Sequence, residues 1–425
     1  MDIPAVSMRV FSGGAGFGKT FHVMQALEEY LQVNPLKDGQ KVLALTYMHG
    51  SRRRLHGRLE ENKGLAGRFE CVVLDGLAGR VVLRWQALLL KMGRSVPAVG
   101  DFNNMCEAAA LLLRDEVVCR WMAATYPVLI LDEAQDLDIS RLAIIQALSV
   151  YINVIAAADE FQCLDDKLRP NKAFEWLESA TEVEWLTKLQ RTKSGELLGA
   201  AAAIRNGVAP VSGKEFRILL APRTRTAGSF LANQLAWYGR AKTTAIITTA
   251  VRGFATSVCT WVAENKADKT GTGPFFIPWE VSESKAAEVY LGALKLPAAA
   301  GAQAFIEYIK AAGDDRTLKD VCDWFDIQRR ALGVTEFQKD VVIEVIERSF
   351  SSRRHASPKG RSRVALTVHG AKNREFDNVV VLWSAATVGD ADHQRRLLYN
   401  AVTRARERCL VLVHLPQAMR SPPFA

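Results

Sequence analysis

A glycine-rich segment near the start of the chain has the residue types and spacing of a loop that wraps around phosphate groups. Residues 13–20 read GGAGFGKT and fit the pattern G-x-x-x-x-G-K-[ST]. Glycines let backbone N–H groups turn towards a phosphate, and the helix that follows adds positive potential at its N-terminus. In such a P-loop, Lys19 reaches the terminal phosphates and Thr20 holds Mg²⁺. The candidate nucleotide-binding residues here are Gly13, Gly14, Ala15, Gly16, Gly18, Lys19 and Thr20.

Two adjacent carboxylates, Asp132 and Glu133, follow the apolar run 127–131. The carboxyl end of a buried parallel strand opens onto the crevice where α/β sheets bind ligands. We therefore predict that Asp132 holds the Mg²⁺ shell and that Glu133 orients and deprotonates the attacking water. A second apolar run ends in AADEFQ at 157–162, where Gln162 is a candidate sensor of the terminal phosphate.

Phosphoryl transfer also needs positive charge near its transition state, and two arginines are candidates to supply it. Arg191 follows the apolar run 183–186, and Arg404 lies within LLYNAVTRAR at 397–406. Either arginine alone would more simply be a solvated surface residue. The surrounding pattern favours a catalytic role for both.

The elements that must position these side chains alternate between apolar strand runs and helical stretches, which is typical of parallel α/β sheets. Two tandem doubly wound sheets fit the pattern better than one large sheet. The first predicted set of strands is Arg9–Phe11, Val42–Thr46, Cys71–Leu74, Val128–Leu131, Val154–Ala157 and Val183–Leu186. The second set is Arg217–Leu220, Ala245–Thr248, Val364–Val368, Val379–Trp383 and Leu410–Val413.

Two stretches with helical periodicity interrupt the alternation, at about 77–124 and 284–350. Apolar residues recur there every three or four positions, so we interpret both as small helical insertions. We accordingly predict a first domain at 1–189 and a second at 190–425. Residues 351–363 (SSRRHASPKGRSR) are predicted to form an exposed basic connector.

Composition restricts the class of protein and its partners. The 425 residues carry a formal net charge of +9, which favours a polyanionic partner. The seven cysteines occur singly with no C-x-x-C pair, so the sequence indicates no zinc or iron–sulfur site and a reducing, cytoplasmic location. No apolar run reaches membrane-spanning length and no secretion signal is evident, so we expect no membrane partner.

In their order along the chain, these motifs resemble those of superfamily 1 helicases of the UvrD/Rep/PcrA-like branch. The set also includes Thr46-Tyr47, 73–76 (VLDG), 159–162 and 189–192 (LQRT). The most specific blocks are TVHGAKNREFD at 367–377 and LYNAVTRAR at 398–406. The resemblance covers nearly the whole chain.

The resemblance implies two tandem RecA-like domains with ATP and Mg²⁺ between them, and translocation on single-stranded DNA from 3′ to 5′. It assigns ATP hydrolysis to Lys19, Thr20, Asp132, Glu133, Gln162, Arg191 and Arg404, and it places Glu375 near the ribose. Tyr47, His369 and the Asp75-Gly76 turn would lie along the DNA strand. The basic cluster at 51–58 would add phosphate contacts through Arg52 and Arg53.

Departures from the family pattern make adenine specificity less certain. The family's adenine-reading glutamine lies well upstream of the P-loop, and this chain begins too close to its own. Gln190 replaces the aromatic residue that stacks on the base, and Asn373 replaces a glycine, where Asn tolerates the left-handed region. A DNA-stacking aromatic after Gln162 is missing. Phe161 or Trp176 could replace it, although both are better explained as core residues.

The sequence is compatible with three hypotheses for the function of the chain and its partner. The leading hypothesis is an ATP-dependent translocase or helicase on single-stranded DNA or a partial duplex. An alternative is an ATPase that senses nucleic acid or nucleotide and regulates a partner nuclease or repair protein, as in antiphage defence. A third is an RNA helicase. Since no nuclease signature is visible, we predict no cleavage activity.

Overall fold

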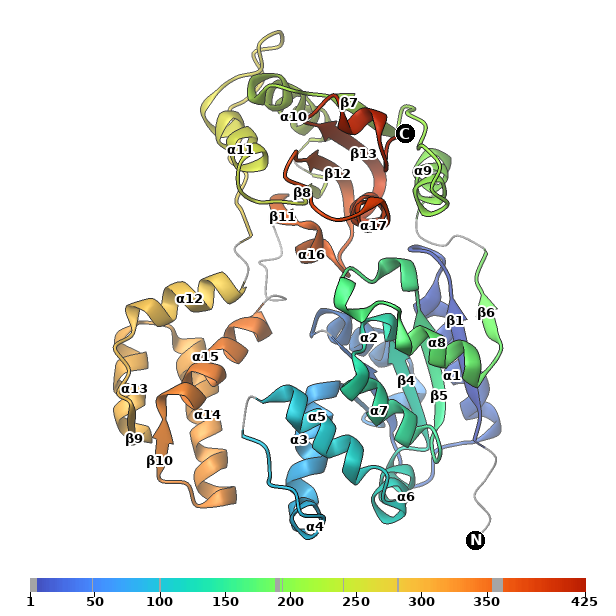
Figure 1. Cartoon of the computed structure of the whole chain (residues 1–425), viewed down its shortest axis with the longest axis vertical. Helices are drawn as coiled ribbons and strands as arrows, with labels where there is room; N and C mark the ends of the chain where they lie inside the picture. Colours follow the sequence, from blue (N-terminus) through green and yellow to red (C-terminus); the bar gives the residue numbers. More distant parts are fainter. Residues whose placement is uncertain are drawn as a thin grey trace.

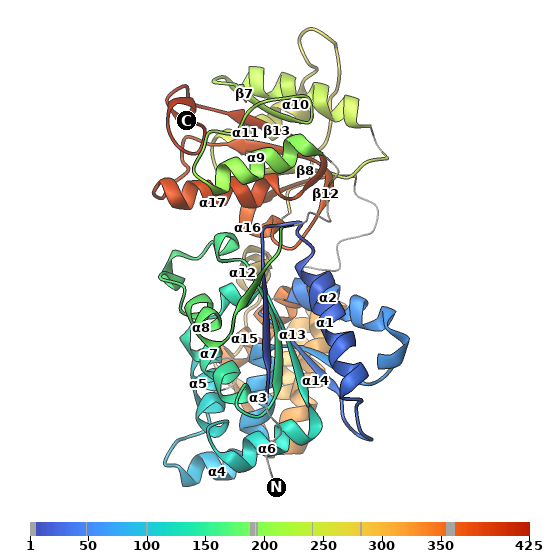
Figure 2. The same cartoon turned by 90° about the vertical axis from the view of Figure 1, so that its right-hand side faces the viewer.

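The computed structural model of the chain contains two RecA-like α/β halves, each built on a parallel β-sheet (Figure 1). It describes residues 6–47, 49–98, 101–187, 192, 194–239, 241–280, 283–353 and 362–425. The halves follow each other along the long axis of the molecule (Figure 2), with the N-terminal half at one end and the C-terminal half at the other. The fold class expected from the sequence is confirmed.

The first half has a six-stranded sheet in the order β3-β2-β4-β5-β1-β6, with every neighbouring pair parallel. Ser12 of β1 is level with Ala158 of β5, so the segments that follow these two strands start side by side. The strands are β1 (Met8–Ser12), β2 (Val42–Thr46), β3 (Phe69–Val73), β4 (Val128–Asp132), β5 (Asn153–Ala158) and β6 (Val183–Trp185).

Helices cover both faces of this sheet, which explains why β2 and β4 are apolar and buried along their whole length. On one face pack α1 (Lys19–Val33) and α2 (His49–Glu61). On the other face pack α3 (Leu74–Arg84), α4 (Gln86–Lys91), α5 (Phe102–Leu112), α6 (Glu116–Thr125), α7 (Ile139–Leu148) and α8 (Lys172–Ala180).

The second half has a five-stranded parallel sheet in the order β11-β8-β12-β13-β7. Its strands are β7 (Phe216–Leu220), β8 (Thr244–Thr248), β11 (Arg363–Thr367), β12 (Phe376–Trp383) and β13 (Ala405–Val413). One face carries α9 (Gly195–Arg205), α16 (Val368–Ala371) and α17 (Ala391–Val402). The other carries α10 (Thr224–Tyr238) and α11 (Phe254–Glu264).

A helical segment with its own apolar core lies between β8 and β11 in the sequence. It consists of α12 (Glu283–Ala293), α13 (Ala302–Ala311), α14 (Asp315–Leu332) and α15 (Lys339–Arg353). A short antiparallel pair, β9 (Ala299–Gly301) and β10 (Glu336–Gln338), joins them and was not expected from the sequence. In Figure 1 this segment stands beside the helices of the first half.

All eleven strands expected from the sequence are present, with ends that differ by a few residues. The predicted Asp75-Gly76 turn is wrong. Helix α3 begins directly after β3, at Leu74, and includes both residues in its first turn. Leu74, Leu77 and Val81 are spaced for one helical face and are buried, so the helix extends up to the strand. Within the described residues, no helix has both the length and the apolar character needed to cross a membrane.

Candidate functional site

The glycine-rich loop connects β1 to α1 at the carboxyl edge of the first sheet. Gly16 and Gly18 have φ angles of 89° and 77°, in the left-handed region that glycine adopts without a steric penalty. Helix α1 then begins at Lys19. The Lys19 Nζ atom donates hydrogen bonds to the carbonyl oxygens of Gly13 at 2.8 Å and Gly14 at 3.3 Å, so its charge is held over the loop.

Asp132 and Glu133 form a buried acidic pair at the end of β4, with exposed fractions of 3% and 5%. Glu133 has a φ of 58°, an uncommon conformation for a residue with a side chain, and its carboxylate accepts a 2.6 Å hydrogen bond from Gln135. Burial and the neighbouring Glu133 raise the pKa of Asp132. Burial also opposes ionisation of Glu133, but the charges of Lys19 and Arg54 prevail and lower its pKa to about 2.

The segment after β5 places a third acidic group beside the loop. Asp159 is fully buried, and its Oδ2 atom lies 3.8 Å from Lys19 Nζ and accepts a 2.7 Å hydrogen bond from Gln162. Its other oxygen pairs with Arg205 of α9 at 2.8 Å. The backbone N–H of Asp159 donates to the Gln135 side chain at 2.9 Å. Hydrogen bonds, together with the ion pair between Lys19 and Asp159, therefore connect the loop, the acidic pair and Gln162.

The second half contributes positive charge to the same region. Arg404 follows α17 and is only 2% exposed; its Nη2 atom lies 3.4 Å from Gln162 Oε1, and its Nε donates to the carbonyl oxygen of Asn400 at 2.9 Å. Glu375, just before β12, is paired with Arg406 at 2.9 Å. A buried arginine that is held in place by the carbonyl oxygen of Asn400 can stabilise negative charge that develops at the boundary between the halves.

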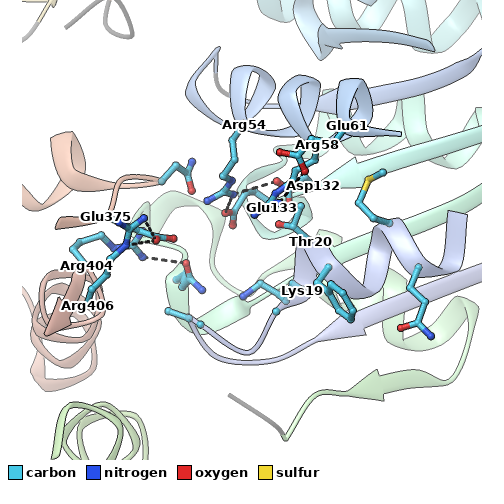
Figure 3. A pocket seen from close by; sticks show the side chains of 18 of the residues that line it. Lys19, Thr20, Arg54, Arg58, Glu61, Asp132, Glu133, Glu375, Arg404 and Arg406 are labelled. Carbon is cyan, nitrogen blue, oxygen red and sulfur yellow. Dashed lines mark hydrogen bonds and ion pairs between the residues drawn. The ribbon is translucent and has the colours of Figure 1, made fainter. Parts of the chain in front are cut away.

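A cavity of about 730 Å³ lies at this junction and gathers most of the predicted nucleotide-site residues (Figure 3). Its lining comes from the P-loop, α1, α2, the acidic pair and the second half. The predicted members are Ala15, Gly16, Gly18, Lys19, Thr20, Asp132, Glu133, Gln162, Glu375 and Arg404. The sequence motifs thus converge on one volume, and Lys19 and Thr20 face Asp132 and Glu133 across it.

Two further contacts join the halves, one of them through Ala15 in the lining of this cavity. The Tyr399 hydroxyl of α17 accepts a 2.7 Å hydrogen bond from the backbone N–H of Ala15. Lys372 donates to both carboxylate oxygens of Asp136 at 2.6 Å. A Cβ atom on Gly14 would lie 2.7 Å from the Tyr399 hydroxyl, so this approach requires glycine at that position.

The predicted nucleic-acid contacts fall into two groups. Tyr47 and Asp75 meet around Arg141 of α7, whose guanidinium lies 5.5 Å from the Tyr47 ring centre and 2.7 Å from the Asp75 carboxylate. Tyr47 is 39% exposed, so part of its ring is open to solvent. His369, in α16, and Arg52, in α2, are exposed on other elements. Gly76 lies next to Asp75 in α3.

Several predicted residues fall outside the described part of the chain. These are Arg191 and Gln190, and positions 354–361 of the predicted basic connector. The Arg53 backbone belongs to α2, but its side chain is not described. The roles of Arg191 and Arg53 stay predictions.

Sequence reasoning missed or misplaced some site residues. Arg54 was grouped with the basic cluster expected to contact nucleic acid, but its guanidinium lies 3.4 Å from Asp132 and 3.5 Å from Glu133. Arg205 carried no motif signal, because its role depends on how α9 packs against the first half. Asn373 has a φ of 63°, which confirms that Asn replaces glycine there by adopting the left-handed conformation. Phe161 packs edge-on against Tyr399 and Trp176 packs on the first core, as expected of core residues.

A match to a known protein family supports part of this interpretation. Residues 363–412 match the family model described as the UvrD-like helicase C-terminal domain. Among solved structures, the arterivirus nonstructural protein 10 (helicase) matches with a TM-score of 0.41 and 9% identity over 97% of this chain and 61% of its own. Its complex with DNA matches with a TM-score of 0.40 and 10% identity over 98% of this chain and 63% of its own. This chain therefore spans less than two thirds of that protein's length. No curated protein sequence matches.

Proposed function

We propose that this chain, a superfamily 1 helicase-like protein by its UvrD-like segment and its ordered motifs, hydrolyses a nucleoside triphosphate to move along single-stranded DNA. The observation that carries the proposal is the approach of Arg404 from the second half to Gln162, beside Lys19 and the acidic pair. A site shared between two RecA-like halves lets hydrolysis change their relative position.

The residues present fit a magnesium nucleotide. Mg²⁺ prefers oxygen ligands, and the Asp132 carboxylate and the Thr20 hydroxyl both line the cavity. When bound, the ion would neutralise charge on the phosphates and polarise them. Lys19 would turn from the carbonyl oxygens of Gly13 and Gly14 to the terminal phosphates.

In this proposal Glu133 orients the attacking water and accepts its proton. The lowered pKa of Glu133 keeps the carboxylate ionised, and movement of Lys19 towards phosphate would withdraw one of the charges that lower that pKa. Arg404 would stabilise charge on the transferring phosphoryl group, with Gln162 reporting the presence of that group. Arg191 would add a second positive charge.

ATP is the expected nucleotide from the resemblance, although Gln190 leaves the choice of base open. Tyr47, Asp75, Gly76, His369, Arg52 and Arg53 are the proposed contacts to the strand. Since such contacts bind backbone and stack bases without reading sequence, we expect little sequence preference.

Nucleotide hydrolysis by the full chain tests the proposal. Rates are measured with each of the common nucleoside triphosphates, alone and with single-stranded DNA or RNA. We expect stimulation by DNA, retained DNA binding with loss of hydrolysis in Lys19→Ala, and a loss of at least about a hundredfold in Arg404→Ala. Arg225→Ala is the matched control, because Arg225 is 73% exposed and pairs with Asp268 away from the site.

Undiminished hydrolysis in Lys19→Ala would overturn the site assignment. Equal stimulation by DNA and RNA would instead refute the preference for DNA. Strand separation by the isolated chain would contradict a purely regulatory role as the subunit of a nuclease.

A further inference from the structure

Arg54 of α2 points into the cavity at the acidic end of β4 (Figure 3). Its Nη2 atom lies 3.4 Å from Asp132 Oδ2 and 3.5 Å from Glu133 Oε1, so one guanidinium faces both carboxylates. Its Nε atom is buried and has no hydrogen-bond partner among the described residues. The contacts with two carboxylates, and a side chain only 30% exposed, set Arg54 apart from an ordinary surface arginine.

The next arginine on the same helical face provides a contrast. Arg58 also lines the cavity, but its side chain is 60% exposed and pairs with Glu61 at 3.0 Å within the helix. That pair is solvated and contributes little to the site. Among the α2 side chains that the structure describes, Arg54 is therefore the one whose charge acts on the acidic pair.

Two adjacent carboxylates in a buried position repel each other and need a nearby cation. The distances from Arg54 exceed the 2.7–2.9 Å of a strong charged hydrogen bond between nitrogen and oxygen. Arg54 thus balances the charge of the pair without a short hydrogen bond to either carboxylate, and another cation can replace it.

We propose that Arg54 is a positioning residue that acts as counter-ion for Asp132 and Glu133 until a nucleotide binds. A divalent cation then occupies the acidic pair only together with a triphosphate. This inference rests on the proposed function. A cation that entered alone would repel the Arg54 guanidinium and take away its contacts with Asp132 and Glu133. A cation that arrives with a triphosphate brings phosphate oxygens into the cavity, where Arg54 pairs with them.

Binding of Mn²⁺ to the nucleotide-free full chain, measured by electron paramagnetic resonance, tests this directly. We expect weak binding to the wild-type protein and binding at least tenfold tighter to Arg54→Gln. Arg54→Lys, which keeps the charge, and Arg58→Gln, the matched control on the same helix, should bind Mn²⁺ as the wild type does. Circular dichroism checks that each variant is folded.

An Mn²⁺ affinity in Arg54→Gln equal to that of the wild type would overturn the proposal. If that variant fails to fold, the wild type still decides the question, because tight Mn²⁺ binding without nucleotide contradicts the role of Arg54. The double variant Arg54→Gln/Asp132→Asn separates this inference from the proposed function. Loss of the gained binding supports the Arg54 role, whereas its persistence would place the ion elsewhere and refute Asp132 as the metal ligand.

Discussion

Removal of one partner from the ion pair between Lys372 and Asp136 should destabilise the protein strongly, because the pair is buried and joins the two halves. Lys372 Nζ lies 2.6 Å from both carboxylate oxygens, and the side chains are 8% and 7% exposed. Burial disfavours the charge on Lys372, but the carboxylates of Asp136 and Glu133 outweigh this effect and raise its pKa. We predict that Lys372→Met destabilises the protein substantially.

The expected magnitude follows from the geometry. At an effective dielectric constant of about 20, two unit charges at this separation attract by about 6 kcal/mol before the cost of desolvation is counted. Removal of one partner leaves the other charge buried, and this typically costs about 3–5 kcal/mol. In Lys372→Met that charge is Asp136, which already stands beside Glu133 and Asp132.

The pH dependence of this loss has a definite sign. Burial and the neighbouring Glu133 raise the pKa of Asp136 to about 6 even though Lys372 opposes the shift, so without Lys372 the pKa rises further. Between its unfolded and folded pKa values, Asp136 then binds more protons in the folded state, and stability falls as the pH rises. The destabilisation by Lys372→Met should therefore be largest above neutral pH and should shrink as the pH falls.

Urea unfolding monitored by tryptophan fluorescence measures the free energy, with Lys242→Met as the matched control. Lys242 pairs with Glu407 in the same half, but the two side chains are 46% and 39% exposed, so its loss should cost less than about 1 kcal/mol. Asp136→Asn and the double variant complete a mutant cycle, in which the double should recover much of the loss. A cost for Lys372→Met no greater than that for Lys242→Met would refute the reasoning.

Two further outcomes follow from packing and burial. Gly14→Ala places a Cβ atom 2.7 Å from the Tyr399 hydroxyl and 2.8 Å from the Phe17 ring. Titration with a fluorescent nucleotide should therefore show nucleotide affinity reduced by roughly tenfold, with partial rescue by Tyr399→Phe. Unchanged nucleotide affinity would contradict the close packing. Of the seven cysteines only Cys322 is not buried, and burial raises the pKa of the Cys259 thiol to about 12. Ellman's reagent should therefore titrate Cys322 in the native protein and the other thiols only on unfolding, and rapid reaction of several thiols would show that the core is open.

The sequence predicted the strands well because their apolar runs are short and bounded by polar or glycine-rich turns. It also predicted that the P-loop and the acidic pair lie together, since the order of strands in a parallel sheet brings their carboxyl ends to one edge. Arg404 lies in the second half, just before β13, and was expected at the site from the family resemblance and not from strand order. The start of α3 was misplaced because a turn and a helix N-terminus share the residue types of Asp75 and Gly76. The direction of Arg54 was not predictable from its basic neighbours, because consecutive residues of a helix point about 100° apart, so that adjacent arginines face different surroundings.

The hydrogen bond from Ala15 to Tyr399 connects the phosphate loop to a helix nearly four hundred positions later in the chain. A nucleotide that reshapes the loop at Ala15 must change the free energy of holding α17 in place. By thermodynamic reciprocity, anything that moves α17, including a strand bound across the two halves, changes nucleotide affinity by the same factor. A change in nucleotide affinity and a change in the relative position of the two halves should therefore accompany each other.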